Sequence, residues 1–303
     1  MPATQATATR MMNTSESSTP LVSVVIPSYN HGKYVRQTIE SILQQSYGPI
    51  QLIVVDDHST DDSPSKLKEL AKSGSFDLVL KTKNEGLVKT LNDGLALARG
   101  TYFAPCASDD YWHADKIALQ VHRLEAESDL KMVFTEGLEI DDTGTVLGSV
   151  RYTRQHRERW YFDDVVLRAD LPPASFMARR ADMLAVGGYS SEFKIEDLPM
   201  WLMLLKHGGY AAVIRRELAN YRNHGSNMHN VFSSMVIDEH YRIIEHFCKD
   251  HPKRGAILSE WQLRNGNFLA GADKRRSIWY LLKAIRHVND YRLYAGIYKN
   301  IVR

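Results

Sequence analysis

The chain has 303 residues, of which 44% are hydrophobic and 24% are charged, and its formal net charge at pH 7 is +2. These values are typical of a soluble globular protein and exclude a fibrous repeat or general disorder. The small net charge gives no reason to expect nucleic acid as a partner. The two cysteines, Cys106 and Cys248, are far apart in the sequence, so neither a disulfide framework nor a structural zinc site is expected.

The first 20 residues are rich in Thr, Ser and Ala and lack the apolar stretch that a secretory signal needs. We predict that residues 1–20 form a disordered tail. No later stretch approaches the roughly 18 consecutive apolar residues of a transmembrane helix. Together with the isolated cysteines, these features predict a cytoplasmic protein.

Strands and helices alternate through the first 130 residues. Apolar runs rich in β-branched residues predict buried strands, and apolar side chains at a spacing of three or four residues predict the helices between them. The predicted strands are 21–27, 50–55, 76–80 and 101–107, and the helices that follow them extend to about residues 45, 70, 98 and 127. This alternation implies right-handed βαβ crossovers and a largely parallel, Rossmann-like sheet.

Polar side chains lie where these strands end. Because ligands of such a sheet bind beyond the carboxyl ends of its strands, four polar clusters at one edge are a stronger signal than any of them alone. The clusters are Tyr29-Asn30, Asp56-Asp57, Asn84 and Asp109-Asp110. The sequence contains neither GxGxxG after the first strand nor GxxxxGK[ST], so phosphate must be held without the usual glycine-rich loops.

Asp109 and Asp110 are neighbouring carboxylates at the end of an apolar run. Two such groups repel each other and lose hydration, which is costly unless a cation or a polar ligand compensates. Mg²⁺ or Mn²⁺ suits them, because these ions prefer carboxylate and phosphate oxygens. The alternative is a turn with solvated Asp side chains, which an isolated Asp-Asp pair would favour.

The second half of the chain is less regular. Residues 131–140 and the turn at 141–144 predict a hairpin, and 211–214 predicts a last strand. Residues 151–170 have no clean periodicity and are interpreted either as a mobile loop over the site or as irregular surface. Glu196-Asp197 begins a helix, where acidic side chains complement the helix dipole, so capping alone is one interpretation of this pair.

Helices are predicted from residue 231 onward. Lys, Arg, Trp and Tyr recur from Lys274 to Lys299. This composition suits peripheral contact with the anionic inner surface of a membrane. A solvated helical cap on the domain fits it equally well.

Short motifs recur in a fixed order from Leu21 to Asn227, and their order and spacing together are highly specific. They are Val-Ser-Val-Val-Ile-Pro-Ser-Tyr-Asn from Val22, Val-Val-Asp-Asp-His-Ser-Thr-Asp from Val54, Asn84-x-Gly86, Asn92-x-Gly94, Ala98-x-Gly100-x-Tyr102, Ser108-Asp109-Asp110-x-Trp112, Gly187-Gly188-Tyr189 ahead of Glu196-Asp197, and Tyr221-Arg222-x-His224. On these motifs the chain resembles the family 2 glycosyltransferases, which are inverting enzymes. The resemblance implies an α/β fold of the GT-A type, with helices on a mostly parallel sheet and a helical C-terminal extension.

The resemblance also implies roles in donor binding. Tyr29 would border the nucleotide base, and Asp57 would hydrogen-bond its edge. Asp109 would contact the ribose or sugar, and Asp110 would bind the metal ion, Mg²⁺ or Mn²⁺, that bridges the diphosphate. Lys83 would help to neutralise phosphate, although a solvated Lys is the usual case. The nucleotide-binding residues expected in this way are Pro27, Tyr29, Asn30, Asp57, Asn84, Lys89 and Asp109.

The catalytic residues implied by the resemblance are Asp197 and Glu196. Asp197 would be the general base, taking a proton from an acceptor hydroxyl as that oxygen attacks the anomeric carbon opposite the leaving nucleoside diphosphate. Such a base typically contributes about 100- to 10,000-fold. His224 would contact the metal or the diphosphate. Many family members have Asp where this chain has Ala107, which leaves the choice of metal open.

The sequence therefore predicts a metal-dependent inverting glycosyltransferase of surface polysaccharide biosynthesis, O-antigen included. Its donor would be a UDP- or dTDP-sugar, and its acceptor a glycan or lipid-linked saccharide. Residues 21–130 would bind the donor, 131–229 would bind the acceptor and supply the base, and 230–303 would form the helical extension. Two alternatives stay open, namely a catalytically silent nucleotide-sugar binding module and a nucleotidyltransferase.

Overall fold

The computed structural model describes residues 19–150, 157–168, 171–225, 227, 233–270, 273–284 and 290–302. Of the predicted disordered tail, only Thr19 and Pro20 lie within these ranges. The predicted irregular segment 151–170 is described only from 157 to 168.

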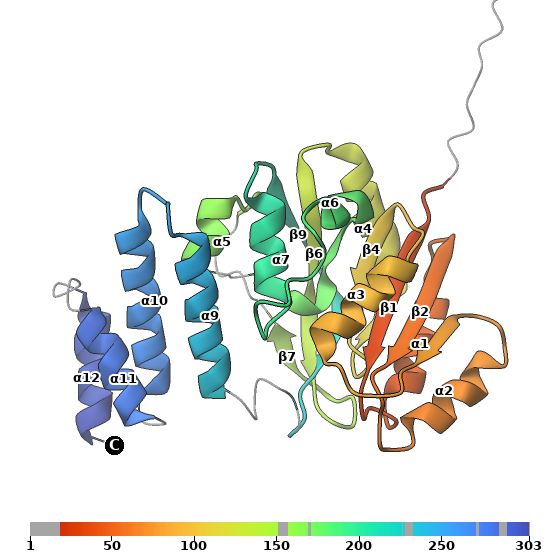
Figure 1. The fold of residues 1–303 in the computed structure, drawn as a ribbon, viewed down its shortest axis with the longest axis horizontal. Coiled ribbons are helices and arrows are strands. Elements are labelled where there is room, and N and C mark those ends of the chain that lie inside the picture. Colours follow the sequence, from red (N-terminus) through yellow and green to blue (C-terminus); the bar gives the residue numbers. More distant parts are fainter. Residues whose placement is uncertain are drawn as a thin grey trace, which may run out of the picture.

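A single mixed sheet forms the centre of the molecule, and helices cover both of its faces (Figure 1). The strand order among the described residues is β3-β2-β1-β4-β8-β6-β9-β5, and β7 pairs with β6. The first four strands, all parallel, are β1 (Val22–Ser28), β2 (Ile50–Asp56), β3 (Asp77–Leu80) and β4 (Tyr102–Pro105). The predicted α/β fold with a mostly parallel sheet is thereby confirmed.

A short antiparallel strand joins the two halves of the sheet. β8 (Met177–Arg179) lies between β4 and β6 (Leu130–Ile140) and is antiparallel to both. β6 therefore runs in the same direction as β1 to β4, and β9 (Tyr210–Arg222) runs parallel to β6. As a result, the loops after β1, β2, β4 and β9 all emerge at one edge of the sheet.

The apolar side chains divide into a core on each side of the sheet. Val24 and Ile26 of β1 point to one side, whereas Val25 points to the other, as the two-residue period of a strand requires. The first side is covered by α1 (Val35–Leu43), α2 (Ser63–Ala71) and α4 (Lys116–Ala126). The second is covered by α3 (Leu87–Leu97), α5 (Phe162–Arg168), α6 (Arg180–Ala185) and α7 (Asp197–Leu205).

Two features of the second half differ from the prediction. The last strand, β9, spans 13 residues rather than four, because its middle is exposed and carries the charged residues Arg215, Arg216 and Glu217, which interrupt the apolar run. Part of the irregular segment is ordered, since Trp160 is buried and forms a β-bridge with Ala211 ahead of α5. The predicted hairpin is confirmed as β6 and β7 (Val146–Val150).

Short strand β5 (Tyr111–Trp112) and 3₁₀ helix η1 (Pro173–Ser175) complete this part of the chain. The predicted helical C-terminal extension is also confirmed. It consists of α9 (Ser233–Phe247), α10 (Arg254–Leu269), α11 (Lys274–Lys283) and α12 (Tyr291–Val302). α9 and α10 pack against the core at α5 and α7, and α11 and α12 form the end of the molecule farthest from β1 to β3 (Figure 1). Among the described residues, no helix combines the length and apolar character needed to cross a membrane.

Candidate active site

The loop that follows β1 reaches the loop that follows β2. Asn30 has a left-handed backbone (φ 56°), which Asn tolerates better than most residues. Its side-chain oxygen accepts a hydrogen bond from the N–H of Thr60 (2.8 Å), and its own N–H donates to Ser59 Oγ (2.9 Å). Tyr29 leaves its ring 46% exposed beside this connection. The loop that carries the next residue, His31, is thus fixed by local bonds.

His31, Asp109 and His224 form a group that we call the strand-end cluster. His224 Nε2 lies 3.0 Å from Asp109 Oδ2, and His31 Nδ1 lies 3.8 Å from Asp109 Oδ1. One ligand atom from each residue lies within 4.8 Å of the other two. In the described part of the chain, no other three His, Cys, Asp or Glu residues are arranged in this way. The three residues come from the loops after β1, β4 and β9, so the common edge of the sheet brings them together.

Other side chains hold the cluster in place. His31 Nδ1 is 2.8 Å from Ser108 Oγ, and the ring of Tyr34 stacks on His224 with centroids 5.4 Å apart. Burial lowers the pKa of His31, and the Asp109 carboxylate partly opposes that shift. A neutral imidazole has a lone pair free for a metal ion. The ligand atoms of the three side chains lie close enough together to share one divalent cation.

Asp110 points away from the cluster. Its Oδ1 accepts a hydrogen bond from the backbone N–H of Arg222 (2.9 Å), and its carbonyl accepts one from Thr38 Oγ1 (2.6 Å). Burial, together with the charge of Asp109, raises the pKa of Asp110 well above its usual value. Asp109 is thus the carboxylate that meets the two histidines, and the sequence-based assignment of Asp110 as the metal ligand stays a prediction.

The Arg222 side chain connects the parts of the chain that surround the cluster. Its Nε donates to the carbonyl of Asp109 (2.9 Å), and its two terminal nitrogens donate to Asp141 O (3.0 Å) and Gln37 Oε1 (2.7 Å). The guanidinium lies over the ring of Tyr34 at 4.7 Å. Arg222 therefore fixes α1, the loop after β4 and the β6–β7 turn relative to one another.

Glu196 and Asp197 stand at the N-terminus of α7. Glu196 occupies the N-cap position, but its side chain makes no capping hydrogen bond, and Asp197 Oδ1 accepts one from the N–H of Leu198 (2.5 Å). Burial raises the pKa of Asp197 to about 6, and burial together with the charge of Asp197 raises the pKa of Glu196 to about 8. At neutral pH the pair thus holds about one proton. Capping alone does not explain such a pair.

A comparison with known protein families shows which family the chain belongs to. A sequence model described as "Glycosyl transferase family 2" matches residues 23–183, more than half of the chain. The chain belongs to this family. The recognition made from the sequence motifs is thereby confirmed.

One curated relative supports the family assignment, and two solved structures share the fold. The chain is 31% identical over 204 residues, covering 67% of its own length and 79% of the relative, to the putative teichuronic acid biosynthesis glycosyltransferase TuaG of Bacillus subtilis. It resembles the structure of S. aureus TarS 1-349 in complex with UDP-GlcNAc, with 16% identity, a TM-score of 0.68, and 92% and 88% of the two chains covered. It also resembles the structure of the mannosyltransferase PcManGT from Pyrobaculum calidifontis in complex with GDP-Man and Mn²⁺. Here the identity is 18%, the TM-score is 0.59, and 94% of this chain and 88% of the other are covered.

In this family 2 chain, Asp57 lies at the end of β2 in a network of its own. Its carboxylate accepts hydrogen bonds from the N–H groups of Glu85 (2.9 Å) and Gly86 (2.7 Å) and from Lys81 Nζ (3.1 Å). Burial alone would raise the pKa of Asp57, but these donors outweigh it and lower the pKa. Asn84 Nδ2 donates to the Asp57 carbonyl (3.1 Å). Asp57 and Asn84 are thus brought together as the sequence indicates.

Two residues of the site were missed from the sequence and two predicted lysines lie elsewhere. His31 lies in the loop three residues after β1, and Lys81 directly follows β3, so their position at strand ends was the available signal. Lys89 pairs with Asp93, and Lys83 pairs with Glu85 at 3.2 Å with its side chain 75% exposed. Their proposed phosphate contacts stay predictions, as does a role for Pro27 at the end of β1.

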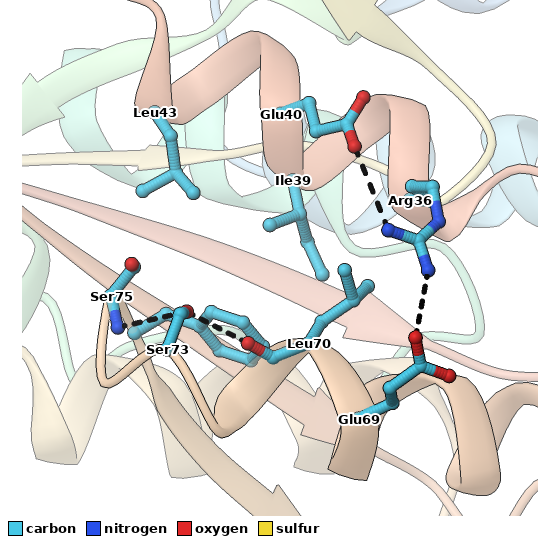
Figure 2. A pocket seen from close by; sticks show the side chains of 9 residues that line it. Arg36, Ile39, Glu40, Leu43, Glu69, Leu70, Ser73 and Ser75 are labelled. Carbon is cyan, nitrogen blue, oxygen red and sulfur yellow. Dashed lines mark hydrogen bonds and ion pairs between the residues drawn. The ribbon is translucent and has the colours of Figure 1, made fainter.

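A surface hollow between α1 and α2 lies outside this site. Figure 2 shows that Ile39, Leu43 and Leu70 line it together with Arg36, which forms ion pairs with Glu40 (3.8 Å) and Glu69 (3.5 Å). None of the predicted site residues lines this hollow. The charged side chains of the rim pair with one another, so the hollow is separate from the strand-end cluster.

Proposed function

We propose that the protein is a metal-dependent inverting glycosyltransferase. It transfers a sugar from a UDP- or dTDP-sugar to a hydroxyl of a glycan or lipid-linked saccharide in surface polysaccharide biosynthesis. The observation that carries this proposal is the placement of the strand-end cluster and Asp57 at one edge of the sheet in a family 2 chain. The similarity to TuaG supports the pathway class, and the UDP-GlcNAc complex of TarS supports the donor class.

The strand-end cluster fits a divalent metal ion. One carboxylate and two imidazoles would hold it, with Asp109 as the charged ligand and His31 and His224 as neutral ones. Mg²⁺ prefers oxygen ligands in octahedral geometry, so the two nitrogens favour Mn²⁺. When bound, the ion supplies positive charge that stabilises the departing diphosphate. The protein's own contribution is to position the two imidazoles, since Ser108 bonds to His31 and Tyr34 stacks on His224.

Asp57 supports the choice of a pyrimidine nucleotide. An ionised carboxylate offers about four acceptor positions, and three protein donors already occupy Asp57. The remaining position suits a base that presents one N–H, which is the imide of uracil or thymine. Guanine presents two donors on the corresponding edge and would leave one of them unpaired, which costs binding energy. The exposed ring of Tyr29 is available to stack on the base.

Asp197 is the general base in this proposal. Because its pKa is raised to about 6, it is largely ionised at neutral pH and still basic enough to take a proton from an acceptor hydroxyl. As the proton moves to Asp197, the acceptor oxygen forms a bond to the anomeric carbon, and the bond from that carbon to the diphosphate oxygen breaks on the opposite face. Glu196 stays protonated beside it and holds the one proton that the pair carries before the reaction.

Isothermal titration with UDP, dTDP and GDP, with and without Mn²⁺, tests the donor site. We expect Mn²⁺-dependent binding of a pyrimidine nucleotide that is lost in Asp109→Asn. Asp115→Asn is the matched control, because the Asp115 side chain is 44% exposed and bonds to Arg216 and Ser46. Equal binding of GDP and UDP would contradict the role of Asp57. Loss of binding in Asp110→Asn with full binding in Asp109→Asn would restore the sequence-based assignment.

A folded protein that binds none of the three nucleotides would favour the catalytically silent module. Binding without turnover of any donor sugar would do the same. Preferential binding of a nucleoside triphosphate over UDP would instead favour the nucleotidyltransferase.

A further inference from the structure

The two last helices expose an unusual share of the large hydrophobic side chains. Sixteen such side chains are exposed among the described residues, and eight of them lie in α11 and α12, which together have only 22 residues. They are Ile278, Trp279, Leu282, Tyr291, Tyr294, Ile297, Tyr298 and Ile301. Large exposed apolar side chains gathered in this way mark an interaction surface rather than scattered surface residues. We call the exposed side chains of α11 and α12 the terminal face.

The apolar side chains follow the period of each helix. In α12, Tyr291, Tyr294, Tyr298 and Ile301 recur every three or four residues and form one stripe. In α11, Ile278 and Leu282 are four residues apart and lie on one side of the helix. The opposite sides of the helices pack inward, where Leu281 and Leu293 belong to a small core shared with α10. Both helices are therefore amphipathic, with an apolar stripe left open.

The same segment carries a strong positive charge. Residues 274–303 contain eight Lys or Arg and a single acidic residue, Asp290, so their formal charge is +7, whereas the whole chain has only +2. Arg276 and Arg292 are used internally, in ion pairs with Asp238 (3.4 Å) and Glu260 (2.9 Å). For Lys274, Arg275, Lys283 and Lys299, in contrast, the described residues provide no acidic partner within 4.0 Å. The charge of the terminal face is thus directed outward.

We propose that the terminal face docks on an anionic phospholipid surface. Aromatic and aliphatic side chains on helices flanked by Lys and Arg match the boundary between lipid headgroups and acyl chains, and each added cation attracts anionic headgroups. Lys283 lies 3.7 Å from the ring centre of Trp279, which pairs a cation with an interfacial aromatic ring. A second copy of the chain suits the face less well, because a symmetric contact would bring two segments of charge +7 together. This proposal does not rest on the glycosyltransferase activity.

Vesicle flotation with the full chain tests the proposal. We expect binding to phosphatidylcholine vesicles that contain phosphatidylglycerol and little binding to pure phosphatidylcholine. Raising the salt from about 0.1 M to about 1 M shortens the Debye length from about 10 Å to about 3 Å, so the binding should weaken strongly. Equal binding to both vesicles, or no binding to either, would overturn the proposal.

Matched variants test whether vesicle binding depends on the positive charges of the terminal face or on the net charge of the whole chain. The triple variant Lys274→Glu, Lys283→Glu, Lys299→Glu should bind anionic vesicles at least about 100-fold more weakly, since each cation near the surface is worth about fivefold in affinity. The control Lys68→Glu, Lys72→Glu, Lys206→Glu makes the same change in net charge with exposed residues elsewhere and should keep most of the binding. An equal loss in both variants would show that net charge alone drives the association.

A second pair of variants tests the apolar stripe. The double variant Leu282→Ser, Ile301→Ser should weaken vesicle binding by about tenfold or more. The control is Leu97→Ser, Leu184→Ser, which changes two other exposed leucines and should not weaken it. Circular dichroism and UDP titration check that each variant is folded. If sedimentation instead shows a dimer that the first pair abolishes, and vesicles do not bind, the face is an interface between copies and the proposal fails.

Discussion

Charged side chains are held by neighbouring groups in the strand-end cluster, whereas those of the terminal face are exposed. In the cluster, Asp109 has two histidines within 4 Å, and Arg222 and Ser108 hold the surroundings through hydrogen bonds. On the terminal face, Lys274, Arg275 and Lys299 are exposed and the neighbouring aromatic rings are open. Fixed charges with few degrees of freedom suit a small ligand that must be held in one pose. Mobile charges on a broad apolar face suit a large and irregular ligand.

The largest effect should come from Asp197→Asn in the sheet half. We expect the release of nucleoside diphosphate from the donor to slow by about 100- to 10,000-fold, because the amide cannot accept the acceptor proton. Nucleotide affinity, measured by titration, should not change. Glu196→Gln is the neighbouring control and should lose far less, since Glu196 is already protonated at neutral pH. Turnover at the wild-type rate in Asp197→Asn would remove it from the mechanism.

Arginine substitutions sharpen the difference between the two regions. Arg222→Ala should lower the free energy of unfolding by about 2–3 kcal/mol, because it leaves the buried carbonyl of Asp109 without its donor and removes the part-buried bonds to Asp141 and Gln37. Arg275→Ala removes the same side chain from an exposed position of α11 and should change it by less than about 0.5 kcal/mol. Urea unfolding measures both. Equal values would mean that the surroundings of the cluster are no more constrained than the surface.

A glycine ahead of α7 tests how firmly Asp197, the proposed base, is held. Gly188 has φ +77°, and a Cβ there would lie 2.7 Å from Asn92 Oδ1, which accepts a hydrogen bond from the N–H of Tyr189. Gly188→Ala should therefore cost about 2 kcal/mol of stability and reduce turnover. Gly148→Ala is the control, since no heavy atom lies within 4 Å of the added carbon. Thermal unfolding of the two variants at the same temperature would contradict the idea that this turn is constrained.

The smallest effect concerns pH. Burial raises the pKa of Asp197 to about 6, so kcat should fall about tenfold for each pH unit below that value as the base becomes protonated. Vesicle binding by the terminal face should stay constant over the same range, because Lys and Arg keep their charge. A turnover profile without an acid limb near pH 6 would argue against Asp197 as the titrating base.

The first half of the fold was readable from the sequence because its strands are continuous β-branched runs. The strands β1 and β2 are buried except for Pro27 and Ile50, so composition alone marks them. β9 was shortened in the prediction because Arg215, Arg216 and Glu217 face solvent in the middle of the strand. The alternation of apolar and polar residues does not reveal a strand whose centre is exposed and whose ends are buried.

The site was predicted less completely, for a geometric reason. Of two adjacent carboxylates, only one can face the cluster, and the choice depends on Asp110 bonding to the backbone of Arg222, 112 residues later. His31 was missed since its nearness to Asp109 follows from the pairing of β1 with β4, which short-range patterns do not encode. The sequence predicted which residues follow the strands, but it did not predict the direction in which each of their side chains points.

Arg222 also has a consequence for how the protein is made. Its bond to Gln37 joins residues 185 positions apart, and His224 follows it by only two. During synthesis, the ribosome must release more than two thirds of the chain before Asp109 can meet its second histidine. A nascent chain that already contains all of β1 to β4 would still lack His224 and therefore a complete strand-end cluster. The enzyme therefore gains this site late in translation, once both halves of the sheet have left the exit tunnel.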